Sequence, residues 1–224
     1  MSKFQLTPLQ KKVLLFFGKN KFGHNFYWTG GTRLAYFWKH RQSFDLDFFS
    51  DNVFFDDEYL IFIRELKEQL KIRKVSFKLD KNRRFYLLDH PQENIKLELV
   101  FFPFPAIQKR KKLVDFSLSI DSLSDVMTNK ILSIYQRNEP KDLFDLYYYL
   151  IHKPDFNFIQ LVQAVNKKFG VVIEPILLIA KIEKLTDQLG ILNPILPIAQ
   201  PRLSEKVRDF FREIFNDLVK EKIK

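Results

Sequence analysis

The chain of 224 residues contains no cysteine, only four histidines and only six glycines. Without cysteine it can form neither disulfides nor thiolate metal sites, and no two histidines have the HxH or HxxxH spacing of a zinc site. We therefore expect that any metal in this protein is held by oxygen ligands.

Long apolar runs are also missing. The most apolar stretch, residues 173–198, is interrupted by charged residues such as Lys181, Glu183 and Asp187, and no N-terminal apolar segment follows a basic region as in a signal peptide. We expect a cytoplasmic protein that does not enter a membrane. Because 46% of the residues are hydrophobic, the chain can form the core of one large domain or two small ones.

Positive charge is in excess, with a net charge of +10. This excess favours association with polyanions such as RNA or nucleotides. The densest basic run, residues 109–112, suits contact with the phosphates of an acceptor strand, although such a run is more often a solvated loop.

Two of the six glycines are adjacent. Gly30-Gly31 follows a strand-like run, residues 26–29, and precedes a helix-favouring run from Thr32 to Trp38. Glycine lets the backbone approach a phosphate closely, and the first amides of a helix have no partner within it, so they can receive an anion. We predict that Gly30, Gly31 and Thr32 seat a nucleotide phosphate.

An acidic pair follows. In residues 44–49 acidic and apolar residues alternate, so in a strand Asp45 and Asp47 project from one face while the apolar side chains enter the core. Two carboxylates this close repel each other unless a cation compensates, and Mg²⁺ bridges carboxylates to phosphates. The glycine turn and the acidic pair together therefore predict Mg²⁺-dependent nucleotidyl transfer. Arg41, just before the pair, is either a triphosphate ligand or a surface cation at a helix end.

Periodicity and breakers predict an α+β chain. The expected elements are a helix after Thr7-Pro8, a helix over 56–70, strands over 72–79, 84–88 and 95–102, and late helices over 155–169, 173–189 and 203–223. Pro103 and Pro105 mark a boundary, beyond which we interpret the chain as helical throughout. Two regions are thus predicted, a core over 1–105 and a helical lobe over 106–224.

Further charged residues are candidates for the same site. Glu98, on the polar face of the strand over 95–102, is either a third acid or part of an exposed edge. Lys130 and Arg137 fall on one face of a helix. Asp142 and Asp145 are neighbours in the first turns of the next helix, where helix capping is the alternative explanation.

The motifs resemble those of a known family. Trp28-Thr29-Gly30-Gly31-Thr32-Arg33-Leu34-Ala35, the run His40 to Phe49, and Lys130, Arg137 and Lys141-Asp142-Leu143-Phe144-Asp145-Leu146-Tyr147 look like the motifs of the AbiEii/AbiGii toxin family of nucleotidyltransferases. The resemblance covers about residues 26–150 and rests on two separate blocks.

The resemblance implies a polymerase beta-like nucleotidyltransferase core, with a mixed sheet flanked by helices, followed by a helical C-terminal lobe. It also implies Mg²⁺ dependence, a nucleoside triphosphate (NTP) substrate, and a toxin–antitoxin or abortive-infection system with a cognate antitoxin protein. Asp45, Asp47, Lys130 and Asp142 are then the catalytic residues. Lys130 binds the triphosphate or the charge of the transition state, and Asp142 orients Lys130, the metal shell or an acceptor hydroxyl. Glu98 stands where relatives of the wider superfamily more often have aspartate.

The acceptor of the nucleotide is left open. Relatives with this architecture add nucleotides to the 3′ end of tRNA, and the positive charge of this chain also favours RNA. Transfer to a small molecule or to a protein side chain would use the same motifs. So would a noncatalytic module that binds RNA or an antitoxin.

Overall fold

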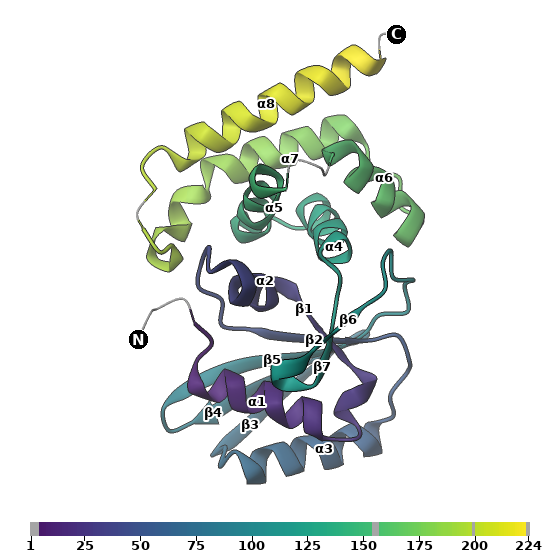
Figure 1. Ribbon diagram of the computed structural model, residues 1–224, viewed down its shortest axis with the longest axis vertical. Helices are drawn as coiled ribbons and strands as arrows, with labels where there is room; N and C mark the ends of the chain where they lie inside the picture. Colours follow the sequence, from purple (N-terminus) through teal and green to yellow (C-terminus); the bar gives the residue numbers. More distant parts are fainter. Residues whose placement is uncertain (1–4, 154–156, 199, 223–224) are drawn as a thin grey trace. The chain divides into compact units, whose positions relative to one another are not determined.

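The computed structural model describes residues 5–153, 157–198 and 200–222, and the chain divides into two compact units, Met1–Ser122 and Leu123–Lys224 (Figure 1). This division lies later than the boundary predicted at residue 105, because residues 111–120 join the sheet of the first unit. None of the described helices is both long enough and apolar enough to cross a membrane.

The first unit is built on a mixed sheet of seven strands. Its elements in chain order are α1 (Pro8–Lys19), η1 (Gly23–Asn25), β1 (Tyr27–Thr29), α2 (Gly30–Trp38), β2 (Leu46–Ser50), α3 (Asp56–Gln69), β3 (Lys74–Asp80), β4 (Arg83–His90), β5 (Glu93–Phe101), β6 (Lys111–Leu113), η2 (Val114–Phe116) and β7 (Leu118–Ile120). The strands follow the order β3-β4-β5-β2-β1-β7-β6. The β2/β5 and β1/β7 pairs are parallel, and the other neighbours are antiparallel.

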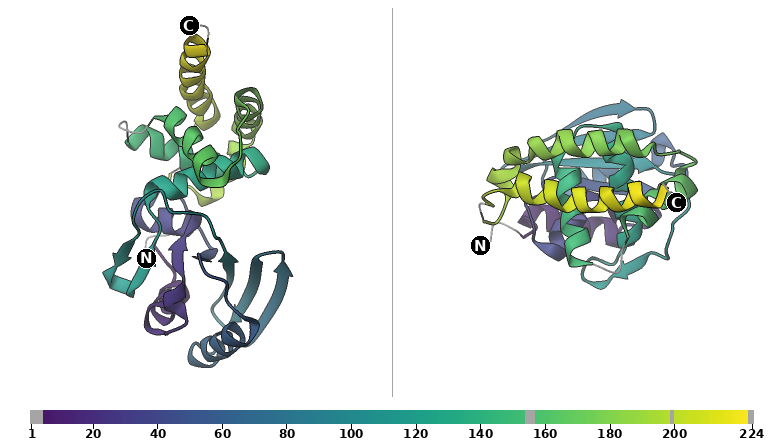
Figure 2. Two further views of the ribbon diagram at one scale, coloured as in Figure 1. Left: turned by 90° about the vertical axis from the view of Figure 1, so that its right-hand side faces the viewer. Right: turned by 90° about the horizontal axis from the view of Figure 1, so that it is seen from above.

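Helices α1 and α3 cover one face of this sheet, and α2 lies on the other (Figures 1 and 2). The covered face holds the hydrophobic core, in which the Phe17 ring of α1 stacks on Phe48 of β2 and packs edge-on against Phe62 of α3. Buried aromatic side chains contribute large apolar areas, so these contacts stabilise the unit and fix α1 on the sheet. The predicted start of α1 is confirmed, because the Thr7 hydroxyl accepts a hydrogen bond from the Gln10 amide at 3.1 Å.

Two short strands, β6 and β7, correct the prediction that the chain beyond Pro105 is helical throughout. β7 pairs in parallel with β1, and its Leu118 and Ile120 are buried. Each strand has only three residues, which is too short for a period of two to be read from the sequence. Their place in the sheet comes from pairing partners that are distant in the chain.

The second unit is helical, as predicted. It comprises α4 (Leu123–Gln136), α5 (Pro140–His152), α6 (Phe158–Phe169), α7 (Pro175–Asp187), η3 (Leu189–Ile195) and α8 (Leu203–Lys222). Helix α4 packs against α5, α6 and α7, and α8 packs along α7 (Figure 2). The predicted helix over 155–169 begins at Phe158 in the described chain, and residues 154–156 lie outside the described residues.

Candidate active site

Strand β1 leads directly into helix α2 through the two adjacent glycines. Gly30 has a φ of 77°, a left-handed conformation that favours glycine, and a Cβ placed there would overlap the Oδ2 atom of Asp47. Glycine is therefore required both by the backbone conformation and by the close approach of the carboxylate. The helix begins at Gly30 rather than at Thr32, so both glycines belong to its first turn.

Four polar side chains form a row across the sheet, which we call the polar row: Glu98, Asp47, Thr29 and Asp121. Asp47 of β2 is in register with Glu98 of β5 on one side and with Thr29 of β1 on the other. Asp121 directly follows β7 and continues the row, because its Oδ2 atom accepts the Thr29 hydroxyl at 3.0 Å. Since side chains alternate along a strand, the row lies on the face of the sheet opposite to the hydrophobic core.

The acidic pair has the arrangement that the sequence predicted. Leu46 and Phe48 are fully buried in the core, so Asp45 and Asp47 project from the opposite face. The Asp45 carboxylate is partly exposed, and its Oδ2 atom lies 4.0 Å from Nζ of Lys96. Both carboxylates therefore reach the face on which the first turn of α2 lies.

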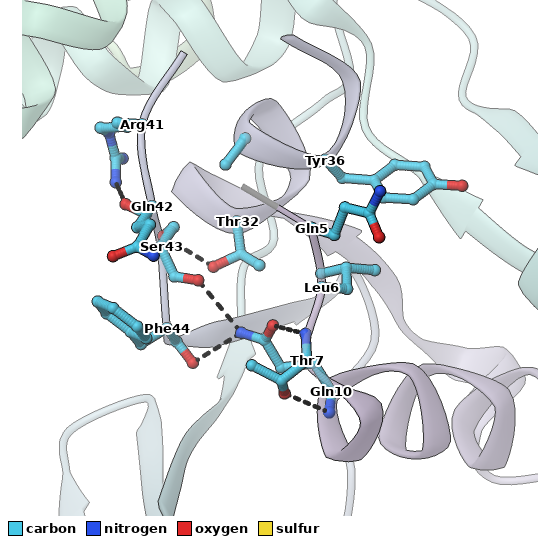
Figure 3. Close-up of a pocket in the computed structure, with 11 residues that line it drawn as sticks. Gln5, Leu6, Thr7, Gln10, Thr32, Tyr36, Arg41, Gln42, Ser43 and Phe44 are labelled. Carbon is cyan, nitrogen blue, oxygen red and sulfur yellow. Dashed lines mark hydrogen bonds between the residues drawn. The ribbon is translucent and has the colours of Figure 1, made fainter. Parts of the chain in front are cut away.

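The loop before the acidic pair is held from two sides (Figure 3). The side-chain amide of Gln10, on α1, donates to the carbonyl oxygens of Ser43 and Phe44, at 3.2 and 3.1 Å. From the other side, the Thr32 hydroxyl of α2 bonds the Asp45 carbonyl oxygen and lies 2.8 Å from the Ser43 hydroxyl. Thr32 thus has a structural role that fixes the position of Asp45. Gln10 was not predicted as a site residue, because its contacts join segments far apart in the chain.

Arg41 lies against the start of α2. A Cβ on Gly31 would overlap Nη2 of Arg41, so the guanidinium packs directly on the glycine backbone. Arg41 is almost fully buried, and its Nη1 atom donates to the Gln42 carbonyl at 2.9 Å. A small pocket lined by Arg41, Thr32, Gln10 and neighbouring residues lies beside this loop, but neither Asp45 nor Asp47 lines it. The guanidinium of Arg41 is therefore buried next to Gly31 and is not a solvated surface cation.

Glu98, the predicted third acid, is bound to a cation. Its Oε1 atom lies 2.8 Å from Nε of Arg83, the first residue of β4, and its side chain is only 9% exposed. This contact places a cation beside a buried carboxylate, which offsets part of the cost of burying the charge.

Further charged side chains lie near Asp121, at the other end of the polar row. Arg110 bonds both oxygens of Asp51, its Cζ atom lies 3.5 Å from the centre of the Tyr27 ring, and its Nε atom is 4.0 Å from Asp121.

Burial, reinforced by the charge of Asp121, raises the pKa of Tyr27. Burial also lowers the pKa of Arg33 to about 10, although Asp121 opposes this effect. The basic run over 109–112 is therefore not uniformly solvated, since Arg110 turns into the protein.

Asp121 and its partners were not recognised from the sequence. The pattern Leu118-Ser119-Ile120-Asp121 alternates apolar and polar residues, as the acidic pair does, and this alternation was the available signal. It spans only one short strand, so it could not be distinguished from a helical segment.

In the second unit, four predicted residues form one ion-pair network. Nζ of Lys130 on α4 lies 2.6 Å from Oδ1 of Asp142 and 2.7 Å from Oδ2 of Asp145, both on α5. Nη2 of Arg137 lies 2.7 Å from Oδ2 of Asp142. Burial raises the pKa of Asp142, but the charges of Lys130 and Arg137 outweigh this effect, so the pKa lies below its ordinary value. Asp142 thus contacts Lys130, one of the three partners that the resemblance implied for it.

A second buried ion pair in this unit was missed. Nζ of Lys168 on α6 lies 2.6 Å from Oδ1 of Asp125 on α4, and both side chains are almost inaccessible to water. Nothing in the spacing of these residues signals the contact, because they are 43 positions apart. Helix α4 is thus tied by buried charges to both α5 and α6.

Asp45 and Asp47 fit a divalent cation. Carboxylate oxygens are the ligands that Mg²⁺ prefers, and Gly30 brings the first turn of α2 directly against Asp47. Within the described residues, no group of three or more histidine and acidic side chains forms a complete metal site. Two carboxylates are nevertheless sufficient, because Mg²⁺ usually keeps several waters and takes its remaining ligands from substrate phosphates.

Comparison with known proteins agrees with this geometry. The family model for the nucleotidyl transferase AbiEii toxin of type IV toxin–antitoxin systems matches residues 14–223. The chain belongs to the AbiEii toxin family. It is thus a nucleotidyltransferase of the toxin type, and AbiEii-type nucleotidyltransferases generally use a divalent metal.

Individual relatives of this AbiEii chain are distant. An uncharacterised protein of Aquifex aeolicus is 29% identical over 169 residues, which are 75% of this chain and 76% of that protein. A solved Helicobacter pylori structure, described as a candidate nucleotidyltransferase, is 18% identical with a TM-score of 0.64 and covers 98% of this chain and 99% of its own. JHP933, also from H. pylori, is 16% identical with a TM-score of 0.62, over 96% and 92% of the two chains. At these identities the structures confirm the nucleotidyltransferase fold alone.

Proposed function

We propose that this protein transfers a nucleoside monophosphate from an NTP to a hydroxyl of RNA, at the 3′ end of tRNA. The observation that carries the proposal is the contact between the first turn of α2 and the carboxylate of Asp47. It supports a site in which a phosphate bound by the helix amides would lie next to a cation bound by the carboxylates. Such a site is what nucleotidyl transfer requires.

The candidate site residues of the first unit each have a role in this proposal. The amides of the first turn of α2 bind the triphosphate, and Gly30 and Gly31 let it approach the backbone. Arg41 adds positive charge beside these amides, where a guanidinium can contact phosphate oxygens. Thr32 and Gln10 hold the loop that carries Asp45, so that the carboxylates are in place before the nucleotide binds.

Asp45 and Asp47 would hold Mg²⁺, which supplies positive charge against the phosphate oxygens when it is bound. In the transfer itself, the oxygen of the acceptor hydroxyl forms a bond to the α-phosphorus, and the bond between that phosphorus and the bridging oxygen breaks. Pyrophosphate leaves with the electron pair of the broken bond, and the hydroxyl proton passes to solvent. The chain thereby contributes mainly orientation and charge neutralisation.

For the second unit, the proposal follows the resemblance. Lys130 would supply charge to the triphosphate, and Asp142 and Asp145 would fix the position of its ammonium group, since both lie within 2.7 Å of Nζ. Arg137 would balance the second oxygen of Asp142. Their mutual neutralisation equally favours a structural role in joining α4 to α5, and stability and activity measurements on a Lys130→Met variant separate the two roles.

RNA is the proposed acceptor because of charge. The net charge of +10 favours a polyanion, and Lys109, Lys111 and Lys112 are exposed around β6. We further propose that the protein acts in the cytoplasm as the toxin of a toxin–antitoxin pair, with a cognate antitoxin that counteracts it. A small-molecule acceptor or a protein side chain is the alternative.

The test is a transfer assay with purified protein, MgCl₂, total tRNA and each of the four α-³²P-labelled NTPs in turn. We expect label on tRNA with the wild type and none above background with Asp47→Ala. Asp80→Ala, which removes an exposed carboxylate at the end of β3, is the matched control and should label tRNA as the wild type does.

The distribution of label separates the alternatives. Label on the protein itself would favour protein modification over RNA, and tRNA binding without any label would favour a noncatalytic module. If Asp47→Ala labelled tRNA as well as the wild type, the proposed metal site would be wrong. Omission of MgCl₂ with EDTA present should abolish labelling by the wild type.

A further inference from the structure

Helix α2 begins with a residue that is suited to capping but does not cap. Thr29 is its N-cap, yet its side chain makes no cap hydrogen bond. Two other helices of the same protein are capped in the usual way: the Thr7 hydroxyl accepts from Gln10 N at 3.1 Å, and Oδ1 of Asn157 accepts from Ile159 N at 2.7 Å. The difference at Thr29 therefore needs a local cause.

The cause is Asp121. Its Oδ2 atom accepts the hydroxyl of Thr29 at 3.0 Å, which holds the hydroxyl at Asp121, and the hydroxyl oxygen accepts no hydrogen bond from the helix amides. The position of Asp121 is fixed because its backbone amide donates to the Trp28 carbonyl at 3.1 Å. The carboxylate is 98% buried, and the cation of Arg110 lies 4.0 Å from it. A carboxylate oxygen beside a cation is well placed to accept the hydroxyl of Thr29.

The consequence concerns the first amides of α2. These amides have no partner within the helix, and a threonine N-cap would normally bond one of them. With the Thr29 hydroxyl directed to Asp121, this donor stays available to an anion beside Gly30 and Gly31. Arg33 in the same first turn is 95% buried, and its Nε and Nη1 atoms have no hydrogen-bond partner among the described residues. The start of α2 thus keeps amide donors that the side chain of the N-cap residue does not bond.

We propose that Asp121 is a positioning residue for triphosphate binding: by accepting the hydroxyl of Thr29, it prevents Thr29 from capping α2 and leaves the first amides for the phosphates. This inference rests on the proposed function, in that the ligand is the triphosphate of the NTP. It assigns a role to an acid that lies outside both sequence motifs.

The test compares four variants: Asp121→Ala, Thr29→Val, the double variant, and Asp121→Asn. In Asp121→Ala the freed hydroxyl caps α2 and competes with the phosphates. We expect nucleotide binding about fivefold weaker, the factor that corresponds to the ~1 kcal/mol of a typical N-cap. Thr29→Val keeps the shape of the side chain but cannot cap, so binding by Thr29→Val and by the double variant should match the wild type. Asp121→Asn still offers an oxygen to Thr29 and should bind as the wild type does.

Binding is measured by isothermal titration with each of the four NTPs in MgCl₂. Restored binding in the double variant supports the inference, because a residue needed only for folding would not be rescued by a second substitution at Thr29. Weak binding that persists in the double variant, or unchanged binding in Asp121→Ala, would overturn the inference and leave the proposed function intact. If the wild type bound none of the four NTPs, the proposed function would fall and this inference with it.

A second measurement does not depend on any nucleotide. Amide hydrogen exchange in the free protein reports whether the first turn of α2 is capped. We expect slower exchange at Gly31 or Thr32 in Asp121→Ala than in the double variant. Equal exchange in the two variants would show that the Thr29 hydroxyl does not move onto the helix, and would refute the proposed mechanism directly.

Discussion

The two units of this protein use charge in opposite ways. In the first unit, Asp45 and Asp47 are partly accessible and lie next to an uncapped helix start. In the second unit, Lys130 is bonded to both Asp142 and Asp145, and all three side chains are buried. Partly accessible carboxylates can receive an ion, whereas buried charges of both signs satisfy one another. The carboxylates of the first unit thus remain accessible to water, whereas the charged network of the second unit joins α4 to α5.

The largest expected effect tests the second unit. Lys130→Met removes the cation that the buried Asp142 and Asp145 share, so we expect the free energy of unfolding to fall by about 3–5 kcal/mol. Denaturant unfolding measures this loss. Lys141→Met is the matched control, because Lys141 is half exposed with its nearest carboxylate, Glu139, at 4.0 Å, and its loss should be below ~1 kcal/mol.

The same variant also tests whether Lys130 acts on the substrate. A folded Lys130→Met protein of normal stability that had lost its transferase activity would show that Lys130 acts on the substrate. In that case the second unit would contribute to nucleotide transfer as well as holding its own helices together, and the contrast between the two units would be wrong.

The next largest effect is on catalysis by the first unit. Asp47→Asn keeps the shape of the side chain but removes its charge, so we expect the rate of nucleotide transfer to fall by a factor of about 10²–10³. The free energy of unfolding should change by less than ~1 kcal/mol, because the carboxylate is accessible. Transfer assays and denaturant unfolding on the same preparation measure both quantities.

Glu98→Gln is the matched control for Asp47. It changes the adjacent acid of the polar row, whose oxygen is engaged by Arg83 at 2.8 Å. We expect Glu98→Gln to lower stability more than activity, the reverse of Asp47→Asn. An equal loss of activity in both variants would instead make Glu98 the third acid that the sequence suggested.

A smaller effect tests the close approach of α2 to Asp47. Gly30→Ala places a Cβ onto the carboxylate, in addition to the strain of a left-handed alanine. Gly170 has a φ of 65°, but a Cβ added there would meet nothing within 4 Å, so Gly170→Ala reports the backbone strain alone, roughly 1–2 kcal/mol. We expect Gly30→Ala to lose about 1–3 kcal/mol more than this control, together with nucleotide binding. Equal losses would contradict the contact with Asp47.

The smallest effect is the pH dependence of the second unit. Because the pKa of Asp142 is lower in the folded than in the unfolded protein, its ion pairs stabilise the fold above the unfolded pKa of about 3.8, and this contribution is lost as the pH falls through the folded pKa. When the pH is lowered from 5 to strongly acidic values, the free energy of unfolding should therefore fall less for Asp142→Asn than for the wild type. Glu139→Gln, which removes an exposed carboxylate at the start of the same helix, serves as the control. Parallel curves for wild type and Asp142→Asn would disprove the effect.

Much of the fold could be predicted from the sequence. The helix after Thr7, the helix over 56–70, the three strands up to residue 102 and the late helices all follow from local periodicity and capping, and the structure confirms them. The strands β6 and β7 could not be predicted, because three residues carry too little pattern. Their pairing with β1 is a tertiary interaction.

For the candidate site, local order in the sequence was enough to predict how the side chains are arranged within one strand or turn. A strand that alternates Asp45-Leu46-Asp47 must place both acids on one face, and adjacent glycines after a strand must allow a close approach. Only the tertiary structure decided which groups these residues meet. The contact of Gly30 with Asp47, the contact of Thr29 with Asp121 and the neutralisation of Lys130 by two aspartates each join residues that are apart in the chain. Strand register and helix packing determine such contacts, and no local pattern encodes them.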